Sequence, residues 1–175
     1  MKNILLVLML LLIAACSNPS EKNAEANQAL VKNYLEAAES KDYDAMASML
    51  SEDYMGLGPS VGDTTNKANA LASFKYNNEN LYESIKYDFS QMIPATIEEG
   101  MATGEWVANW TYVTINYKDG RGPINLWVNA VYKIENGVIA RSRTFYNEAD
   151  ALAQLGYRVF PPLTVPEEPT STESN

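Results

Sequence analysis

The sequence predicts an α+β domain in which helices come first and an antiparallel β-sheet follows. Three observations lead to this prediction. Apolar residues recur every three to four positions in segments between residues 24 and 76, which is the period of an amphipathic helix. After residue 76 they recur at every second position, the period of a half-buried strand. Short turns separate the later segments, as neighbouring antiparallel strands require.

Three helices are expected before the sheet. The first covers residues 24–39, and its apolar stripe consists of Leu30, Val31, Tyr34, Leu35 and Ala38. The second is shorter, follows Asp42 as a capping residue and runs to Leu50. Turn-forming residues then break any regular element: Gly56, Gly58, Pro59, Gly62 and Asp63. The third helix covers residues 66–76.

The strands come next. They are expected at residues 85–89, 105–117, 124–134 and 138–146. Asn136-Gly137 is a strong hairpin signal between the last two strands. A final short helix at residues 148–155 ends at Gly156, a residue typical of the position after a helix. Because short turns join these strands, we expect an antiparallel meander.

The strand at residues 105–117 is substantially apolar on both faces. One face carries Trp106, Ala108, Trp110, Tyr112, Thr114 and Asn116, and the other carries Val107, Asn109, Thr111, Val113, Ile115 and Tyr117. If one face packs on the helices, the other needs a second cover. Two interpretations are open, namely a homodimer through the outer sheet face or central burial within one large curved sheet.

The composition removes several classes of function. The 175 residues include no His and one Cys, which excludes Ser-His-Asp and Cys-His catalysis, His-ligated metals, internal disulfides and Cys-rich zinc clusters. The 13 Lys and Arg against 22 Asp and Glu give a net charge of −9, without the basic surface that nucleic acid requires. We therefore expect no metal, no cofactor and no nucleic acid partner.

The N-terminus reads as a secretion signal. The apolar run at residues 4–15 spans roughly 18 Å as a helix, too little for a bilayer core of about 30 Å, and is typical of a signal peptide. It ends in Ile13-Ala14-Ala15-Cys16, which resembles the lipobox of bacterial lipoproteins with Cys16 as the lipidated residue. The alternative is an ordinary signal peptide with a Cys nearby by chance.

The lipobox resemblance implies a chain held to the membrane by an N-terminal lipid anchor. The expected organisation is a signal peptide at residues 1–15, the lipidated Cys and a tether at 16–23, the domain at 24–160, and a disordered acidic Pro/Ser/Thr tail at 161–175. The expected location is the bacterial cell envelope. Ser17, rather than Asp, after the Cys favours the outer membrane in a Gram-negative cell.

Between about residues 24 and 157, the order of several short motifs resembles the nuclear-transport-factor-2-like superfamily, especially its SnoaL-like and ketosteroid-isomerase-like branches. The motifs are the helix from Val31 to Ala38, then Lys41-Asp42-Tyr43-Asp44, Leu50-Ser51-Glu52-Asp53-Tyr54, Asn136-Gly137-Val138-Ile139 before Arg141, and Gln154-Leu155-Gly156. The resemblance implies a cone in which a bent sheet wraps around a long helix and encloses a pocket open at one end, often in dimers.

The resemblance also identifies which catalytic groups are missing. The isomerase branch pairs an Asp base with a Tyr and a protonated Asp that stabilise an oxyanion. The Tyr matches Tyr34, but the base falls on Gly58 before Pro59, and the second acid falls near Asn129 or Ala130. Steroid-isomerase chemistry is therefore not expected, and the absence of His excludes the dehydratase-like branch.

The polyketide-cyclase branch uses an acid near the last strand and helix. Asn147 stands where many relatives have Asp, which leaves Glu148 and Asp150 as candidate carboxylates. The alternative is that both acids only stabilise the first turn of the last helix through its dipole. Tyr34 is likewise either a catalytic donor or a core aromatic residue whose hydroxyl meets a polar partner.

Further candidates for lining a pocket are Trp106, Trp110, Trp127 and Asn129, although aromatic residues on strands also serve as core or interface. Three functions are then open. The first is an envelope lipoprotein that binds a small, largely apolar ligand or acts as an interaction module, without the isomerase base. The second is an enzyme of the cyclase or isomerase type that uses Glu148 or Asp150 with Tyr34. The third is a structural domain with a filled core.

Lipidation at Cys16 has a direct test. Cells that express the wild-type chain or Cys16→Ser are labelled with a radioactive fatty acid, and the purified proteins are compared. We expect label in the wild-type chain and none in Cys16→Ser, because this thiol is the only one in the chain. Equal incorporation in both chains would refute the anchor.

Overall fold

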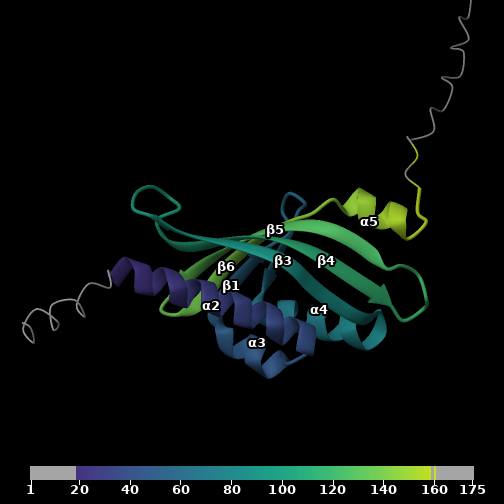
Figure 1. The fold of residues 1–175 in the computed structure, drawn as a ribbon, viewed down its shortest axis with the longest axis horizontal. Coiled ribbons are helices and arrows are strands. Elements are labelled where there is room, and N and C mark those ends of the chain that lie inside the picture. Colours follow the sequence, from purple (N-terminus) through teal and green to yellow (C-terminus); the bar gives the residue numbers. More distant parts are fainter. Residues whose placement is uncertain (1–18, 159, 161–175) are drawn as a thin grey trace, which may run out of the picture.

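The computed structural model describes residues 19–158 and residue 160. Cys16 and the segments predicted as signal peptide and tail lie outside the described residues. The described residues form ten elements, most of which are labelled in Figure 1. They are α2 (Pro19–Ser40), α3 (Tyr43–Met49), β1 (Leu50–Leu57), β2 (Thr64–Asn66), α4 (Lys67–Asn80), β3 (Tyr82–Ile97), β4 (Gly104–Tyr117), β5 (Ile124–Glu135), β6 (Val138–Phe145) and α5 (Glu148–Gln154). Within this described part, no helix is both long and apolar enough to cross a bilayer.

All six strands form one curved sheet in the order β2-β1-β6-β5-β4-β3. Strands β3 to β6 are the predicted antiparallel meander, with partners such as Val113 and Leu126 across β4 and β5. Helices α2, α3 and α4 lie together on one side of the sheet (Figure 1). The predicted α+β class with helices packed in a curved sheet is therefore confirmed.

The structure differs from the prediction at the start of the sheet. Strand β1 includes Gly56, the first of the residues expected to break regular structure, whereas Gly58 to Asp63 form the expected loop. The strand pairs in parallel with β6, so that the sheet is mixed. A glycine suits position 56 of this strand because two side chains approach its backbone closely. A Cβ there would lie 2.8 Å from both the Tyr54 hydroxyl and the Thr65 methyl group. Helix α2 also begins at Pro19, inside the segment predicted as a tether.

The predicted helical stripe forms the centre of the main core. Val31 and Ala38 of α2 are fully buried, together with Met46 of α3 and Val107 and Ile139 of the sheet. A second cluster, defined by Ile85, Val113, Ile115, Ile124 and Leu126, lies nearer α5. Among the described residues, every member of both clusters falls between residues 30 and 155, so this part of the chain contains both clusters.

The two faces of β4 meet different environments. Its odd-numbered residues from Val107 to Ile115 are buried on the concave, helix-covered side. The opposite, convex face exposes aromatic residues, among them Trp110 at 42%, Trp127 at 65% and Phe145 at 45%. No element of the described chain covers these rings, and a homodimer through this face stays a prediction.

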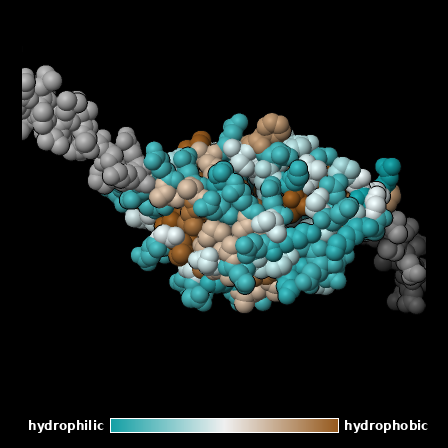
Figure 2. Space-filling model, turned by 60° about the horizontal axis from the view of Figure 1, so that its bottom comes forward, coloured by the Kyte–Doolittle hydropathy of each residue, from teal (hydrophilic) through white to brown (hydrophobic). Residues whose placement is uncertain are grey.

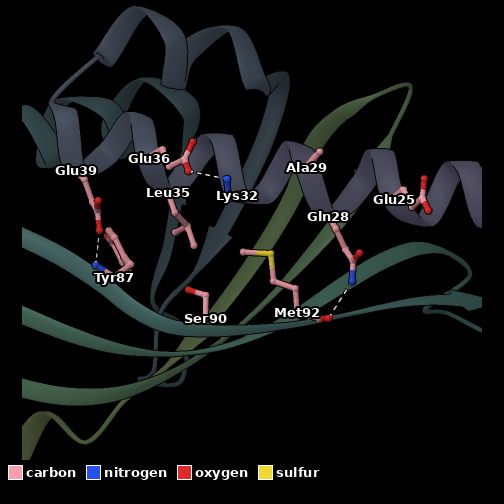
Figure 3. A pocket seen from close by; sticks show the side chains of 10 residues that line it. All are labelled: Glu25, Gln28, Ala29, Lys32, Leu35, Glu36, Glu39, Tyr87, Ser90 and Met92. Atoms are coloured by element: carbon pink, nitrogen blue, oxygen red, sulfur yellow. Dashed lines mark hydrogen bonds and ion pairs between the residues drawn. The ribbon is translucent and has the colours of Figure 1, made fainter.

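Hydrophilic residues cover most of the helix-bearing side of the molecule, where hydrophobic residues show only in part of the surface (Figure 2). Between α2 and the neighbouring edge strand β3 lies a groove of about 600 Å³, lined by a mixture of charged, polar and apolar side chains (Figure 3).

Side chains of α2, together with that of Lys41 just after the helix, cap the free edge of β3. Gln28 Nε2 donates to the Met92 carbonyl over 2.9 Å, and the Glu39 carboxylate accepts from the Tyr87 N–H (Figure 3). Lys41 Nζ donates to the Glu83 carbonyl over 3.1 Å. These bonds occupy backbone groups of an edge strand that would otherwise be free to pair with another chain.

The cap on β3 predicts an unequal response to two neighbouring substitutions on α2. Glu39→Ala leaves the half-buried Tyr87 N–H without a partner, and we expect the free energy of unfolding to fall by about 1–3 kcal/mol in urea denaturation. Glu36→Ala removes only an exposed ion pair with Lys32, and we expect a loss of about 0.5 kcal/mol or less. Equal losses would show that the cap contributes nothing specific.

Candidate functional site

The concave side of the sheet encloses a cavity of about 580 Å³, a size common among ligand pockets. Strands β1 and β3 to β6 form its floor, while α2 and α4 form its sides. Its apolar lining includes Phe74, Ile85, Val113, Ile115, Ile124, Leu126, Val128 and Leu155. The exposed lining residues come mainly from the β1–β2 loop and from the segment around α5, so we define these two segments as the rim of the cavity.

Four tyrosines, Tyr34, Tyr54, Tyr87 and Tyr132, lie together in the wall of this cavity. The Tyr34 and Tyr132 rings meet edge to face with centroids 6.4 Å apart. The Tyr54 hydroxyl shares a hydrogen bond of 2.7 Å with Ser142 Oγ. The cavity therefore presents phenol groups as well as aliphatic side chains.

Burial raises the pKa of each of these phenols. For Tyr34 the main cause is desolvation, with smaller contributions from neighbouring Tyr54 and Tyr132. The pKa values of Tyr87 and Tyr132 are raised for the same reason, and that of Tyr54 is raised despite its hydrogen bond to Ser142. The phenols consequently stay protonated at neutral pH and act as neutral hydrogen-bond donors.

The predicted acids take different positions. Glu148 lies at the exposed rim of the cavity, whereas Asp150 does not line it. The Asp150 carboxylate accepts a hydrogen bond of 2.9 Å from Gln154 Nε2, and both acids occupy the first turn of α5. The structure brings Tyr34 and Glu148 to one cavity, but not Asp150, whose position suits the helix-stabilising alternative.

The three tryptophans and Asn129 lie on the convex face of the sheet and do not line the cavity. Trp106 Nε1 donates to the Ala102 carbonyl over 2.7 Å, and the Trp127 ring packs edge to face on Tyr112 with centroids 5.3 Å apart. These four residues lie outside the cavity because successive side chains of a strand point to opposite faces of the sheet. The helices cover the face that carries Val107 and Leu126, so the side chains of the opposite face point outward, among them Trp106, Trp110, Trp127 and Asn129.

The carboxylate of Asp63, which the sequence interpretation missed as a site residue, lies beside Gly58. A Cβ on Gly58 would lie 1.9 Å from Oδ2 of Asp63, so the Asp63 side chain occupies the space that a side chain at position 58 would need. The Gly58 N–H donates to the Asp63 carbonyl over 3.0 Å, which folds the β1–β2 loop into this arrangement. Asp63 lines the cavity at its exposed rim, as Glu148 does.

Among the described residues, no group of three or more acids or cysteines could hold a metal ion. No Lys or Arg lines the cavity. The site is thus a neutral, largely apolar space with phenol and amide groups inside and two carboxylates at its entrance. Such a site can enclose and orient a small neutral molecule.

Comparison with known protein families shows to which family this chain belongs. The sequence profile of the SnoaL-like domain matches residues 31–142, which include α3, α4 and the first five strands, together with the C-terminal part of α2 and part of β6. The chain belongs to the SnoaL-like domain family. A comparison with curated protein sequences gave no match.

Solved structures show the same SnoaL-like fold. A candidate polyketide cyclase from Xanthomonas campestris superposes with a TM-score of 0.61 at 20% identity, over 76% of this chain and 98% of that chain. A second candidate polyketide cyclase, from Pseudomonas putida, gives 0.60 at 24% identity, over 74% and 97%. The wild-type protein IdmH from Streptomyces antibioticus, also a candidate polyketide cyclase, gives 0.59 at 16% identity, over 75% and 99%.

The sequence offered uneven signals for the residues of this SnoaL-like cavity. Tyr34 could be selected from the sequence because it lies on the apolar stripe of the first helix. Asn109 was not selected, because an Asn within an apolar strand is read as a minor interruption, and Asn78 lies in a polar run beyond the end of the predicted third helix. Asp63 was read only as a turn residue, since no local pattern places its side chain beside Gly58.

The buried phenols predict a loss of stability at alkaline pH. Their pKa values are raised in the folded state, so the unfolded chain releases protons near pH 10 that the folded chain still holds. The free energy of unfolding should be insensitive to these groups below about pH 10 and fall above it, by up to about 1.4 kcal/mol per pH unit for each phenol.

Urea denaturation across this range, with tyrosinate absorbance recorded in parallel, measures the effect. Tyr34→Phe should reduce the slope above about pH 10, because one raised pKa is removed. If stability does not fall above about pH 10, or if Tyr34→Phe leaves the slope unchanged, burial of these phenols is not the cause.

Proposed function

We propose that this SnoaL-like protein is a lipid-anchored protein of the bacterial cell envelope whose cavity binds a small, neutral, largely apolar molecule without transforming it. The single observation that carries the proposal is the cavity of about 580 Å³, enclosed by aliphatic and aromatic side chains. A structural domain with a filled core would not leave this volume empty, since protein interiors are normally close-packed.

The charges around the cavity support a neutral ligand. An anionic ligand would find no Lys or Arg among the lining residues, and it would have to pass Asp63 and Glu148 at the rim. A cationic ligand would lose its hydration inside, where the phenols are held protonated by their raised pKa values. A neutral apolar molecule meets neither cost.

The arrangement of the domain is compatible with an anchor at Cys16. Helix α2 begins at Pro19, close in sequence to Cys16, and its first residues lie at one end of the long axis of the molecule (Figure 1). Helix α5, which belongs to the rim, lies toward the other end (Figure 1). An anchor at Cys16 would therefore leave the rim open to the surrounding solution.

An enzyme of the cyclase or isomerase type is the second candidate. The observation that favours it is the Asp63 carboxylate, which stands beside Gly58 at the edge of the cavity. Glu148 and Asp63 are both exposed to solvent, however, and Asp150 does not line the cavity. No carboxylate thus lies inside with the phenols, where it could exchange a proton with an enclosed substrate, and this favours binding.

Ligand binding is tested with a matched pair of substitutions on β4. Val113 faces the cavity, whereas the adjacent Thr114 lies on the convex face. The chain from residue 17 onward, which keeps both core clusters, is purified and titrated with the neutral apolar dye Nile red, and native mass spectrometry shows any co-purified molecule. We expect binding by the wild-type chain and Thr114→Trp, and a loss of about tenfold or more in Val113→Trp because the indole fills the cavity.

Circular dichroism verifies that both variants are folded. A wild-type chain that holds no dye and no co-purified molecule would contradict the proposal. Binding that survives in Val113→Trp would place the ligand elsewhere. Conversion of a co-purified molecule to a product of different mass, lost in Asp63→Asn, would favour the enzyme instead.

A further inference from the structure

Two buried amides in the cavity wall have no hydrogen-bond partner. Asn109 is fully buried and Asn78 is 3% exposed, and both line the cavity. For each, neither the side-chain nitrogen nor the side-chain oxygen meets a donor or acceptor within the described chain. Native proteins satisfy the large majority of buried polar groups, so two such amides at one cavity require an explanation.

Other buried polar side chains in the cavity wall do have hydrogen-bond partners. Thr111, the next inward residue of β4, is also buried, but its hydroxyl accepts from Ser90 and donates to the Asp88 carbonyl, each over 3.0 Å. Tyr54 pairs with Ser142. The fold therefore does supply partners for buried hydroxyl groups here, and among the residues that the structure describes only these two amides have buried side-chain atoms without a partner.

The amides reach the cavity from different elements. Asn78 belongs to the last turn of α4, and Asn109 lies in the middle of β4. Aliphatic residues such as Ile85, Val113 and Leu126 line the same space. A molecule in this cavity would place its apolar body on this aliphatic wall, and a polar group on it would have an unpaired amide on α4 or on β4 as its partner.

We propose that Asn78 and Asn109 recognise a neutral donor–acceptor group, a carboxamide or lactam, on the apolar ligand of this cavity. The inference rests on the proposed binding function. A primary amide offers two N–H donors and a carbonyl acceptor without charge, and it therefore matches a second amide better than it matches an ion. Because each of the four amide atoms is almost completely buried, the proposal requires small rotations of neighbouring side chains when the ligand binds, a common change on binding.

Three neutral probes of similar shape test the proposal: 2-quinolone, which is a lactam, N-methyl-2-quinolone, which lacks the N–H donor, and 1-methylnaphthalene, which lacks both polar groups. They are titrated by calorimetry and by NMR of the Asn side-chain amides, using the chain from residue 17 onward. We expect the lactam to bind at least about tenfold tighter than the naphthalene, which corresponds to about 1.4 kcal/mol. The N-methyl compound should lie between them.

Asn109→Leu and Asn78→Leu replace each amide by an apolar group of similar shape. Each should reduce the lactam preference to about threefold or less while leaving naphthalene binding nearly unchanged. Both should raise the melting temperature of the ligand-free protein, because an unsatisfied buried polar group is removed. Asn69→Leu makes the same change at an exposed position in the first turn of α4, and it should alter neither property.

The outcomes separate this inference from the function on which it rests. If all three probes bind equally and the Leu variants change nothing, the cavity binds ligands but the amides do not recognise them. A lower melting temperature in both Leu variants, with the lactam preference intact, would assign the amides a structural role. Binding of none of the probes, together with failure of Nile red to bind, would overturn both proposals.

Discussion

The packing of α2 into the concave face of the sheet is the contact on which the remaining structure depends. Val31 and Ala38 are fully buried there, and Tyr34 is 6% exposed. This contact sets which face of the sheet is inside, and it also brings α2 side chains to the open edge of β3. The concave face beyond the α2 contact encloses the cavity. The core and the cavity are thus two consequences of one helix covering one curved surface.

The sequence predicted the regular elements where the periodicity was long and clean. The stripe of α2, the Asp42 cap of α3 and the Asn136-Gly137 hairpin are all present. Strand β1 was not predicted, because its glycine and the turn residues after it are typical of a loop. Its pairing depends on Ile139 and Arg141 of β6, which are distant in sequence. A parallel pair of this kind has no short-range signal.

The candidate site was only partly predictable for the same reason. Period-two alternation sorts the residues of β4 and β5 into two faces, but when both faces are apolar it does not say which one the helices cover. Trp110 and Trp127 were therefore reasonable pocket candidates until the position of α2 was known. The place of Asp63 beside Gly58 depends on the path of a loop, which no pattern in the sequence encodes.

The distribution of charge is consistent with the proposed binding function. The chain carries a net charge of −9, but its cavity holds phenols and amides, and the nearest carboxylates remain in solvent at the rim. General acid or base catalysis needs a group that changes its protonation near neutral pH while it touches the substrate. Burial raises the pKa of Tyr34, Tyr54, Tyr87 and Tyr132, and amides do not titrate in this range, so none of these groups changes its protonation near neutral pH. What the interior does hold is fixed, neutral hydrogen-bonding capacity in an apolar wall, which can select a molecule without changing it.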